Sequence, residues 1–156
     1  MSSFEGIRYL GRLFLRNTSF YTDGVLDLSS LQKAVASLQR ALVRAKADAE
    51  DTELRDACIQ RFEYTFELAW KMLKRQLEAE IENKVEVDSY SKKTLFRIGA
   101  ERGLIGDPKP WFNYLDKRNL TTHTYDESNA QLVYSVVNQF MLDTEDFLKR
   151  LQERGD

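Results

Sequence analysis

The sequence predicts an all-α protein, an up-and-down bundle of four to five helices. Apolar residues recur at spacings of three and four along several long segments, which is the period of an amphipathic helix. No segment has a convincing strand pattern, and the chain contains neither an internal repeat nor a glycine-rich phosphate loop. Its 156 residues are enough for one domain with a substantial core.

Composition and charge exclude several classes of protein. A net charge of −2 and a pI near 5.6 argue against a broad basic surface that coats nucleic acid, so any such contact must be local. The one cysteine, Cys58, cannot form an internal disulfide and is expected to be a core thiol. With one histidine and no ligand spacing, neither a metal site nor a cofactor is predicted. The absence of a membrane-spanning run and of a cleavable signal favours a cytoplasmic protein.

Residues 1–24 are interpreted as an N-terminal extension or docking helix, and residues 25–156 as the bundle domain. An apolar stripe and a basic face could each form at helical spacing in this extension, from Ile7, Leu10 and Phe14 and from Arg8, Arg12 and Arg16. The basic face is either solvated or an arm that touches phosphate or an acidic partner. Asp23-Gly24 marks the break that follows.

Two long helices open the bundle. The first runs from Leu28 to about Lys46, with Ser29 or Ser30 as its cap. The second begins at Thr52 or a neighbour and continues to about Glu82, a length on the order of 45 Å that suits a spine. Its apolar stripe consists of Leu54, Cys58, Phe62, Phe66, Ala69, Trp70, Leu73, Leu77 and Ile81. Its three large aromatic residues are assigned to the core rather than to base stacking, because no basic residues interleave with them on that face.

Three shorter segments follow. Residues 83–90 form a charged connection, after which Ser91 caps a helix that places Leu95 and Ile98 inward. Gly103 supplies the left-handed stop of that helix. Residues 106–110 form a rigid turn, and a short helix begins at Pro110 and ends near Arg118.

The last helix extends to about Arg150. Its predicted buried side consists of Leu132, Val133, Val136, Val137, Phe140, Met141, Phe147, Leu148 and Leu151.

The stretch from Arg118 to Tyr125 is the strongest candidate for a chemical site, because it holds the only histidine, His123. The β-branched pair Thr121-Thr122 weakens helix continuation. Residues 124–127 fit a capping box in which Thr124 and Glu127 begin the last helix. His123 would then lie just before a helix N-terminus and face Arg118.

An unbroken helix through the same stretch remains open. It would place Arg118 and Tyr125 on one face and pair His123 with Asn119 at i,i+4. Glu63 and Glu67, also spaced i,i+4 on the long helix, are more consistent with a solvated face or a salt bridge to Arg118 than with acid–base work.

Two blocks carry a family resemblance. Residues 60–71, Gln-Arg-Phe-Glu-Tyr-Thr-Phe-Glu-Leu-Ala-Trp-Lys, and residues 118–125 resemble the nucleotidyltransferase substrate-binding protein family, a branch of the HEPN superfamily, over about residues 27–152. The second block matches the arginine, four residues, histidine, one residue, tyrosine pattern of HEPN proteins paired with minimal nucleotidyltransferases (MNT). The resemblance implies a dimeric helical bundle with an MNT partner. In many relatives this is a toxin–antitoxin pair whose HEPN member is a metal-independent ribonuclease. By the same likeness Arg118 and His123 are catalytic positions, and Tyr125 is the residue open to adenylylation by the partner.

The residue types suit this chemistry independently. An imidazole, with a reference pKa of about 6.5, can take the proton of a ribose 2′-hydroxyl or protonate the leaving oxygen. Arg118 can hold phosphate oxygens, and Asn119 can orient the histidine or contact phosphate. One histidine per chain supplies one proton shuttle, so a twofold dimer would supply both acid and base. AMP on Tyr125 would occupy the space of the RNA phosphate.

Two functions are therefore expected. The first is a HEPN ribonuclease toxin that cleaves RNA, with tRNA as one candidate, and is neutralised by an MNT antitoxin. The second is a non-catalytic subunit that presents a substrate to a nucleotidyltransferase, with Arg118 and His123 used for binding.

Overall fold

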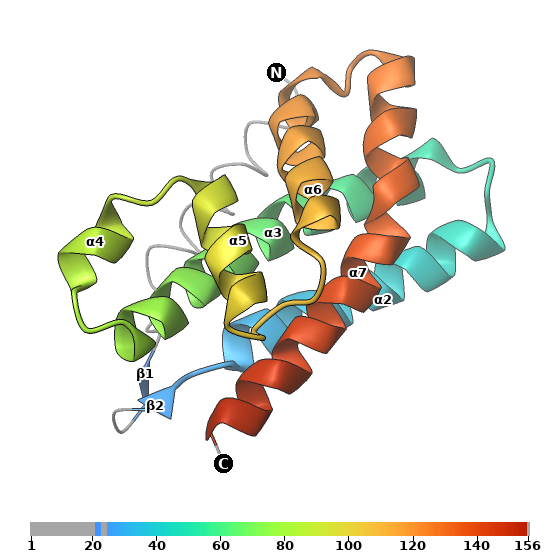
Figure 1. The fold of residues 1–156 in the computed structure, drawn as a ribbon. Coiled ribbons are helices and arrows are strands. Elements are labelled where there is room, and N and C mark those ends of the chain that lie inside the picture. Colours follow the sequence, from blue (N-terminus) through green and yellow to red (C-terminus); the bar gives the residue numbers. More distant parts are fainter. Residues whose placement is uncertain (1–20, 23–24, 156) are drawn as a thin grey trace.

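The fold is built almost entirely from helices, in agreement with the all-α prediction (Figure 1). The structure is a computed structural model that describes residues 21–22 and 25–155. Its helices are α2 (Ser29–Ala47), α3 (Thr52–Glu80), α4 (Lys84–Asp88), α5 (Lys92–Glu101), α6 (Pro108–Leu120) and α7 (Glu127–Gly155). A 3-10 turn, η1 (Thr121–His123), joins α6 to α7.

Helix α3 is the spine, as predicted, and it packs against α2, α5, α6 and α7. In Figure 1, α3 crosses the middle of the molecule, α2 runs beside it, and α7 extends from the α6–α7 turn at one end to the C-terminus at the other. Helices α6 and α7 lie side by side next to that turn. The up-and-down path therefore brings the end of α6 close to α3.

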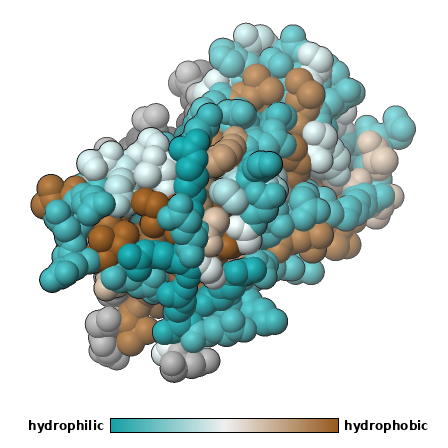
Figure 2. Space-filling view, in the orientation of Figure 1, coloured by the Kyte–Doolittle hydropathy of each residue, from teal (hydrophilic) through white to brown (hydrophobic). Residues whose placement is uncertain are grey.

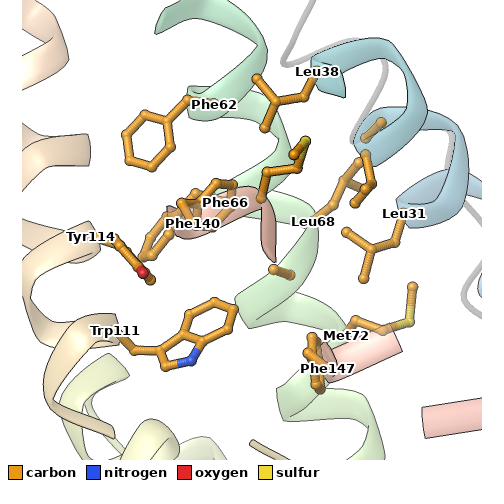
Figure 3. Packing of buried hydrophobic residues seen from close by; sticks show 14 of the residues in the cluster. Leu31, Leu38, Phe62, Phe66, Leu68, Met72, Trp111, Tyr114, Phe140 and Phe147 are labelled. Carbon is orange, nitrogen blue, oxygen red and sulfur yellow. The ribbon is translucent and has the colours of Figure 1, made fainter. Parts of the chain in front are cut away.

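Aromatic rings from three helices meet in the core (Figure 3). Phe62 of α3 contacts Phe140 of α7 edge to face, with ring centroids 4.8 Å apart. Trp111 and Tyr114 of α6 pack on the same ring of Phe140, at 6.0 and 5.2 Å. Edge-to-face aromatic packing adds to the gain from burying the rings, so α6 is firmly fixed to the spine. Cys58 is also buried, as the sequence predicted.

Several helix ends agree with the predicted caps. The side chain of Ser91 accepts from the amide of Thr94, and Gly103 adopts a positive φ of 76°. Asp51 caps α3 next to the predicted Thr52. The prediction for α2 was wrong, because the amide of Ser29 donates to the carboxylate of Asp27 and neither Ser29 nor Ser30 acts as a cap.

The segment around α6 differs from the prediction in its boundaries. Helix α6 begins at Pro108 rather than Pro110, since the Asp107 carboxylate accepts from the amide of Lys109. Both prolines fit in the first turn, where amide hydrogens have no intrahelical acceptor. A short helix, α4, also forms within the predicted connection, because Asn83 caps it and Val87 is buried.

Helix α7 is longer than predicted and ends at Gly155 rather than near Arg150. Arg150 donates to the carbonyl of Gly103 at 3.1 Å, and Arg154 donates to the carbonyl of Arg102. These contacts attach the last turns of α7 to the end of α5. Leu132, predicted on the buried side, is 50% exposed.

A short β-hairpin precedes α2. Strands β1 (Tyr21–Thr22) and β2 (Val25–Leu26) pair antiparallel, with Tyr21 opposite Leu26 and Thr22 opposite Val25. Two-residue strands are too short to produce the alternation that would have revealed them in the sequence. The predicted docking helix, with its apolar stripe and arginines, lies outside the described residues. Among the described helices, none combines the length and apolar character needed to cross a bilayer.

Candidate functional site

The turn between α6 and α7 is a real break in the helix, so the alternative of one unbroken helix is wrong. Helix α6 ends at Leu120, one 3-10 turn follows, and α7 begins at Glu127. Threonine hydroxyls hold this turn. Thr121, which is fully buried, donates to the carbonyl of Arg118 at 2.6 Å, and Thr124 donates to the carbonyl of Thr121 at 3.3 Å.

Asp126 caps the start of α7. Its Oδ1 accepts from the hydroxyl of Ser128 at 2.7 Å and from the amides of Ser128 and Asn129 at 2.9 and 3.3 Å. The hydroxyl of Ser128 and these amides hold the pKa of Asp126 below its usual value.

The predicted capping box was therefore wrong. The hydroxyl of Thr124 points back to Thr121, and the carboxylate of Glu127 accepts from Arg55 of α3 instead. Glu127 is thus engaged in attaching the start of α7 to α3.

Arg118 extends from the last turn of α6 toward α3. Its Nε donates to Oε1 of Glu67 at 2.7 Å, and its Nη2 lies 3.9 Å from Oε1 of Glu63. The second oxygen of Glu67 accepts from the indole nitrogen of Trp70 at 3.0 Å. The predicted salt bridge to Arg118 is confirmed, and Nη1 of Arg118 has no hydrogen-bond partner among the described residues.

His123 and Tyr125 lie on the outside of the same turn. Both side chains are exposed, Tyr125 to 87%, and their rings meet edge to face with centroids 6.0 Å apart. Asn129 donates to the backbone carbonyl of His123 at 3.1 Å and so helps fix the turn. Within the described part of the chain, neither the imidazole of His123 nor the hydroxyl of Tyr125 forms a hydrogen bond, and no hydrogen bond joins His123 to Arg118.

Asn119 completes the set of sequence-predicted site residues, and it is exposed in the last turn of α6. All four residues therefore lie between the last turn of α6 and the start of α7. The guanidinium of Arg118 is bound by Glu67, and the side chains of Asn119, His123 and Tyr125 are exposed. Such a set can bind an anion and move a proton. Within residues 21–22 and 25–155, no three His, Cys, Asp or Glu side chains form a group that could hold a metal ion.

Trp70 differs from the sequence interpretation. Phe62 and Phe66 are buried as predicted, but Trp70 is only partly buried. Lys92 of α5 lies over its ring, with Nζ 4.7 Å from the ring centroid, and Nζ of Lys71 lies 5.7 Å from it. The sequence did not reveal this neighbourhood because Lys92 comes from a different helix.

The amino-acid sequence is similar to a known family and to a named protein. A model of the family described as nucleotidyltransferase substrate binding protein like matches residues 26–153. A Haemophilus influenzae protein named probable ribonuclease HepT is 35% identical over 139 residues, which cover 83% of this chain and 94% of that protein.

Two solved structures resemble the fold. The first, from Haemophilus influenzae, is described as the fold of a substrate binding domain of a nucleotidyltransferase. It has a TM-score of 0.76 and 34% identity, and the match covers 81% of this chain and 99% of that one. The second, from Thermus thermophilus, has a TM-score of 0.64 and 35% identity, with 78% and 98% of the two chains covered.

Proposed function

Because the chain belongs to the nucleotidyltransferase substrate binding protein like family, we propose that it is a metal-independent ribonuclease, the HEPN toxin of a HEPN–MNT pair. The observation that carries this proposal is the exposed imidazole of His123 in the 3-10 turn that follows Arg118, whose guanidinium donates to Glu67 at 2.7 Å. A relative with 35% identity named probable ribonuclease supports it.

The proposed reaction uses the 2′-hydroxyl of RNA as the nucleophile. One His123 removes the proton of this hydroxyl, and the oxygen attacks the adjacent phosphorus. Arg118 stabilises the added negative charge on the phosphorane through Nη1, and Asn119 orients the histidine or contacts the phosphate. The bond to the 5′-oxygen then breaks, and that oxygen receives a proton. The products are a 2′,3′-cyclic phosphate and a 5′-hydroxyl.

A homodimer supplies the second proton-transfer group. The described residues of one chain contain a single histidine, whereas the reaction requires both an acid and a base. A twofold arrangement would bring two copies of His123 to one cleft. The exposure of His123 and Tyr125 supports this, because neither is covered within the described chain.

Tyr125 is the proposed point of control by an MNT antitoxin. Its phenol is 87% exposed and its ring lies beside His123, so an enzyme can reach its hydroxyl. In the proposed step the phenol releases its proton to solvent and its oxygen attacks the α-phosphate of ATP. The bond from the α-phosphorus to pyrophosphate breaks, and AMP remains on the tyrosine. The added bulk and negative charge would then repel an RNA phosphate from Arg118.

Incubation with the partner and ATP tests this control step. Intact mass should rise by one or more AMP units in the wild type and stay unchanged in Tyr125→Phe. A wild type without an increment, or a Tyr125→Phe variant that gains the same increment as the wild type, would exclude Tyr125 as the modified residue.

The second candidate function is a non-catalytic subunit that presents a substrate to a nucleotidyltransferase. The engagement of Arg118 by Glu67 and Glu63 favours it, since this guanidinium is partly neutralised before any anion binds. A structural relative described as a substrate binding domain favours it as well.

Cleavage of total RNA and tRNA in excess EDTA separates the two functions. We expect the wild type to cleave and both His123→Ala and Arg118→Ala to lose cleavage while their mass in solution is unchanged. A folded, unmodified wild type that leaves RNA intact would favour the substrate-binding subunit. Equal cleavage by all three proteins would indicate a contaminant or another site.

A further inference from the structure

The first six residues of α5 include three cations that lie over aromatic rings. Nζ of Lys92 is 4.7 Å from the ring centroid of Trp70 in α3. Nζ of Lys93 and Cζ of Arg97 are 5.9 and 5.2 Å from the ring centroid of Phe112 in α6. We call these five residues the α5 surface.

The cations of the α5 surface have no acidic partner among the described residues. Nearby cations differ, because Lys74 pairs with Asp88 at 2.9 Å and Arg150 pairs with Asp146 at 2.8 Å. The positive charges of Lys92, Lys93 and Arg97 are therefore not neutralised by a carboxylate of the described chain, although the net charge of the whole chain is −2. In Figure 2, hydrophilic side chains cover the middle of the molecule over α5, and hydrophobic residues reach the surface in separate patches.

The two rings are neither core residues nor freely exposed. Trp70 and Phe112 are both partly buried and pack against the core on one side. Each ring is fixed on its core side and has a flexible cation over its face, and a stacked base could take the place of that cation. A cation over a half-exposed ring contributes less than a stacked base does, so a base can displace it and free the cation for a phosphate.

The α5 surface adjoins the proposed reaction centre. The indole nitrogen of Trp70 donates to Glu67 at 3.0 Å, and the same carboxylate accepts from Arg118 at 2.7 Å. Phe112 and Asn119 are seven residues apart in α6, so they share a face and lie about 10 Å apart along the helix axis. Both rings are therefore within a few nucleotides of the turn that holds His123.

We propose that the α5 surface binds single-stranded RNA next to the scissile phosphate, with bases stacked on Trp70 and Phe112 and phosphates held by Lys92, Lys93 and Arg97. This inference rests on the proposed ribonuclease function and adds the residues that hold the substrate. Alternating aromatic and cationic groups fit a single strand because every base has a face that can stack and every nucleotide carries a phosphate.

Binding is measured in the non-cleaving His123→Ala protein with a fluorescent single-stranded RNA at several salt concentrations. The triple change Lys92→Ala/Lys93→Ala/Arg97→Ala should weaken binding by about tenfold or more at low salt. It should also reduce the slope of log K against log salt by about 2, since each phosphate contact to a single strand contributes roughly 0.7.

The matched control removes the same charge from α2. Lys33, Arg40 and Arg44 are exposed there, and α2 packs on α3 and α7 rather than on α5. Lys33→Ala/Arg40→Ala/Arg44→Ala should leave both affinity and salt slope within about twofold of the parent, apart from the weak effect of net charge.

The stacking part of the proposal has its own pair of variants. Phe112→Leu should weaken binding by about fivefold or more, the lower end of what loss of one stacked base costs, whereas Phe112→Tyr should retain it. Circular dichroism at increasing temperature confirms that each variant is folded. Equal binding by Leu and Tyr at this position would exclude stacking on Phe112.

The outcomes separate this inference from the proposed function. If the wild type cleaves RNA and the α5 triple variant retains its KM, affinity and salt slope, the α5 surface is not the substrate surface although the ribonuclease stands. If the wild type neither binds nor cleaves RNA, both proposals fail. If the triple change alters the mass in solution but not RNA affinity, the surface is a contact between copies of the chain, which also overturns the inference.

Discussion

The carboxylate of Glu67 holds two groups at once, Arg118 through Oε1 and Trp70 through Oε2. This fixes the guanidinium relative to α3 before any substrate arrives. Because Glu67 belongs to the rigid spine, it acts as a positioning residue for Arg118.

Replacing Glu67 with glutamine should reduce RNA cleavage by about 10- to 100-fold. A hydrogen bond between charged groups contributes about 1.5–3 kcal/mol, and each 1.4 kcal/mol corresponds to a factor of about ten in rate. The loss should appear in kcat more than in KM, because the one oxygen left in glutamine can still accept from Trp70 of the α5 surface while its NH2 group cannot accept from Arg118. Single-turnover cleavage at saturating RNA measures it.

Glu63→Gln is the matched control, since its carboxylate lies 3.9 Å from Arg118 rather than 2.7 Å. Glu63→Gln should reduce the rate of RNA cleavage less than Glu67→Gln does. Equal losses in the two variants would mean that overall charge, and not the position of Arg118, sets the rate.

Cys58 should be nearly inert in the folded protein. The thiol is fully buried, and burial raises its pKa to about 11, which lowers the thiolate fraction at pH 8 by about 100-fold relative to an exposed cysteine. Mass spectrometry after iodoacetamide treatment should show labelling in urea but not in buffer.

The same pKa predicts a loss of stability in base. Between the unfolded value of 9.0 and the folded value of about 11, the unfolded chain releases the thiol proton and the folded chain keeps it. This contribution to the free energy of unfolding is therefore complete below pH 9 and declines as the pH rises toward 11. A Cys58→Ala variant that declines by as much as the wild type would assign the effect to other groups.

At the level of single residues, a contact could be predicted where regular helical spacing places its residues on one face. Glu63 and Glu67 share a helical face, and an arginine at the end of another helix was a plausible partner, so the pairing with Arg118 could be predicted. The cations over Trp70 and Phe112 could not, because the packing of α5 between α3 and α6 brings them there and no local pattern encodes it.

Asp126 is the residue on which the start of α7 depends. Asp126→Ala removes the acceptor for the amides of Ser128 and Asn129, so the thermal midpoint should fall by a few degrees. Loss of this cap should loosen the first turn of α7, from which the side chain of Asn129 donates to the carbonyl of His123, so RNA cleavage should fall as well. Differential scanning calorimetry and the cleavage assay measure the two effects.

Thr124→Ala serves as the comparison, because a capping box at Thr124 would make it the more damaging change. The hydroxyl of Thr124 bonds to Thr121 at 3.3 Å and not to an amide of α7. We expect Thr124→Ala to lower the thermal midpoint less than Asp126→Ala does. The reverse order would show that Thr124 caps α7, as the capping box requires.

Among the elements, periodicity located the long helices and tertiary contacts decided their ends. Helices α2 and α3 were found within two residues of their bounds because their apolar stripes are long. The extension of α7 to Gly155 depends on Arg150 and Arg154 reaching the carbonyls at the end of α5, which is a contact between distant segments. Helix α4 was missed because five residues are too few for a period of 3.6 to be recognised.

For the whole molecule, the proposed chemistry requires a dimer. Light scattering coupled to size exclusion should give twice the 18.2 kDa of one chain. Mixing His123→Ala with wild-type protein should depress cleavage by more than the dilution of wild-type chains, since mixed dimers lack one proton-transfer group. A monomeric wild type with full activity would remove the second histidine from the mechanism.

The charges around Arg118 have a consequence for when the protein can act. One arginine beside Glu63 and Glu67 amounts to a net negative centre in a single chain. A phosphate will not bind there unless further positively charged side chains lie close to it, either from the α5 surface or from a second copy of the chain. If the second copy is required, the active fraction rises faster than the amount of protein, so doubling its expression would more than double RNA cleavage while a basal level stays harmless. The abundance of the chain would then set a threshold for the proposed RNA cleavage.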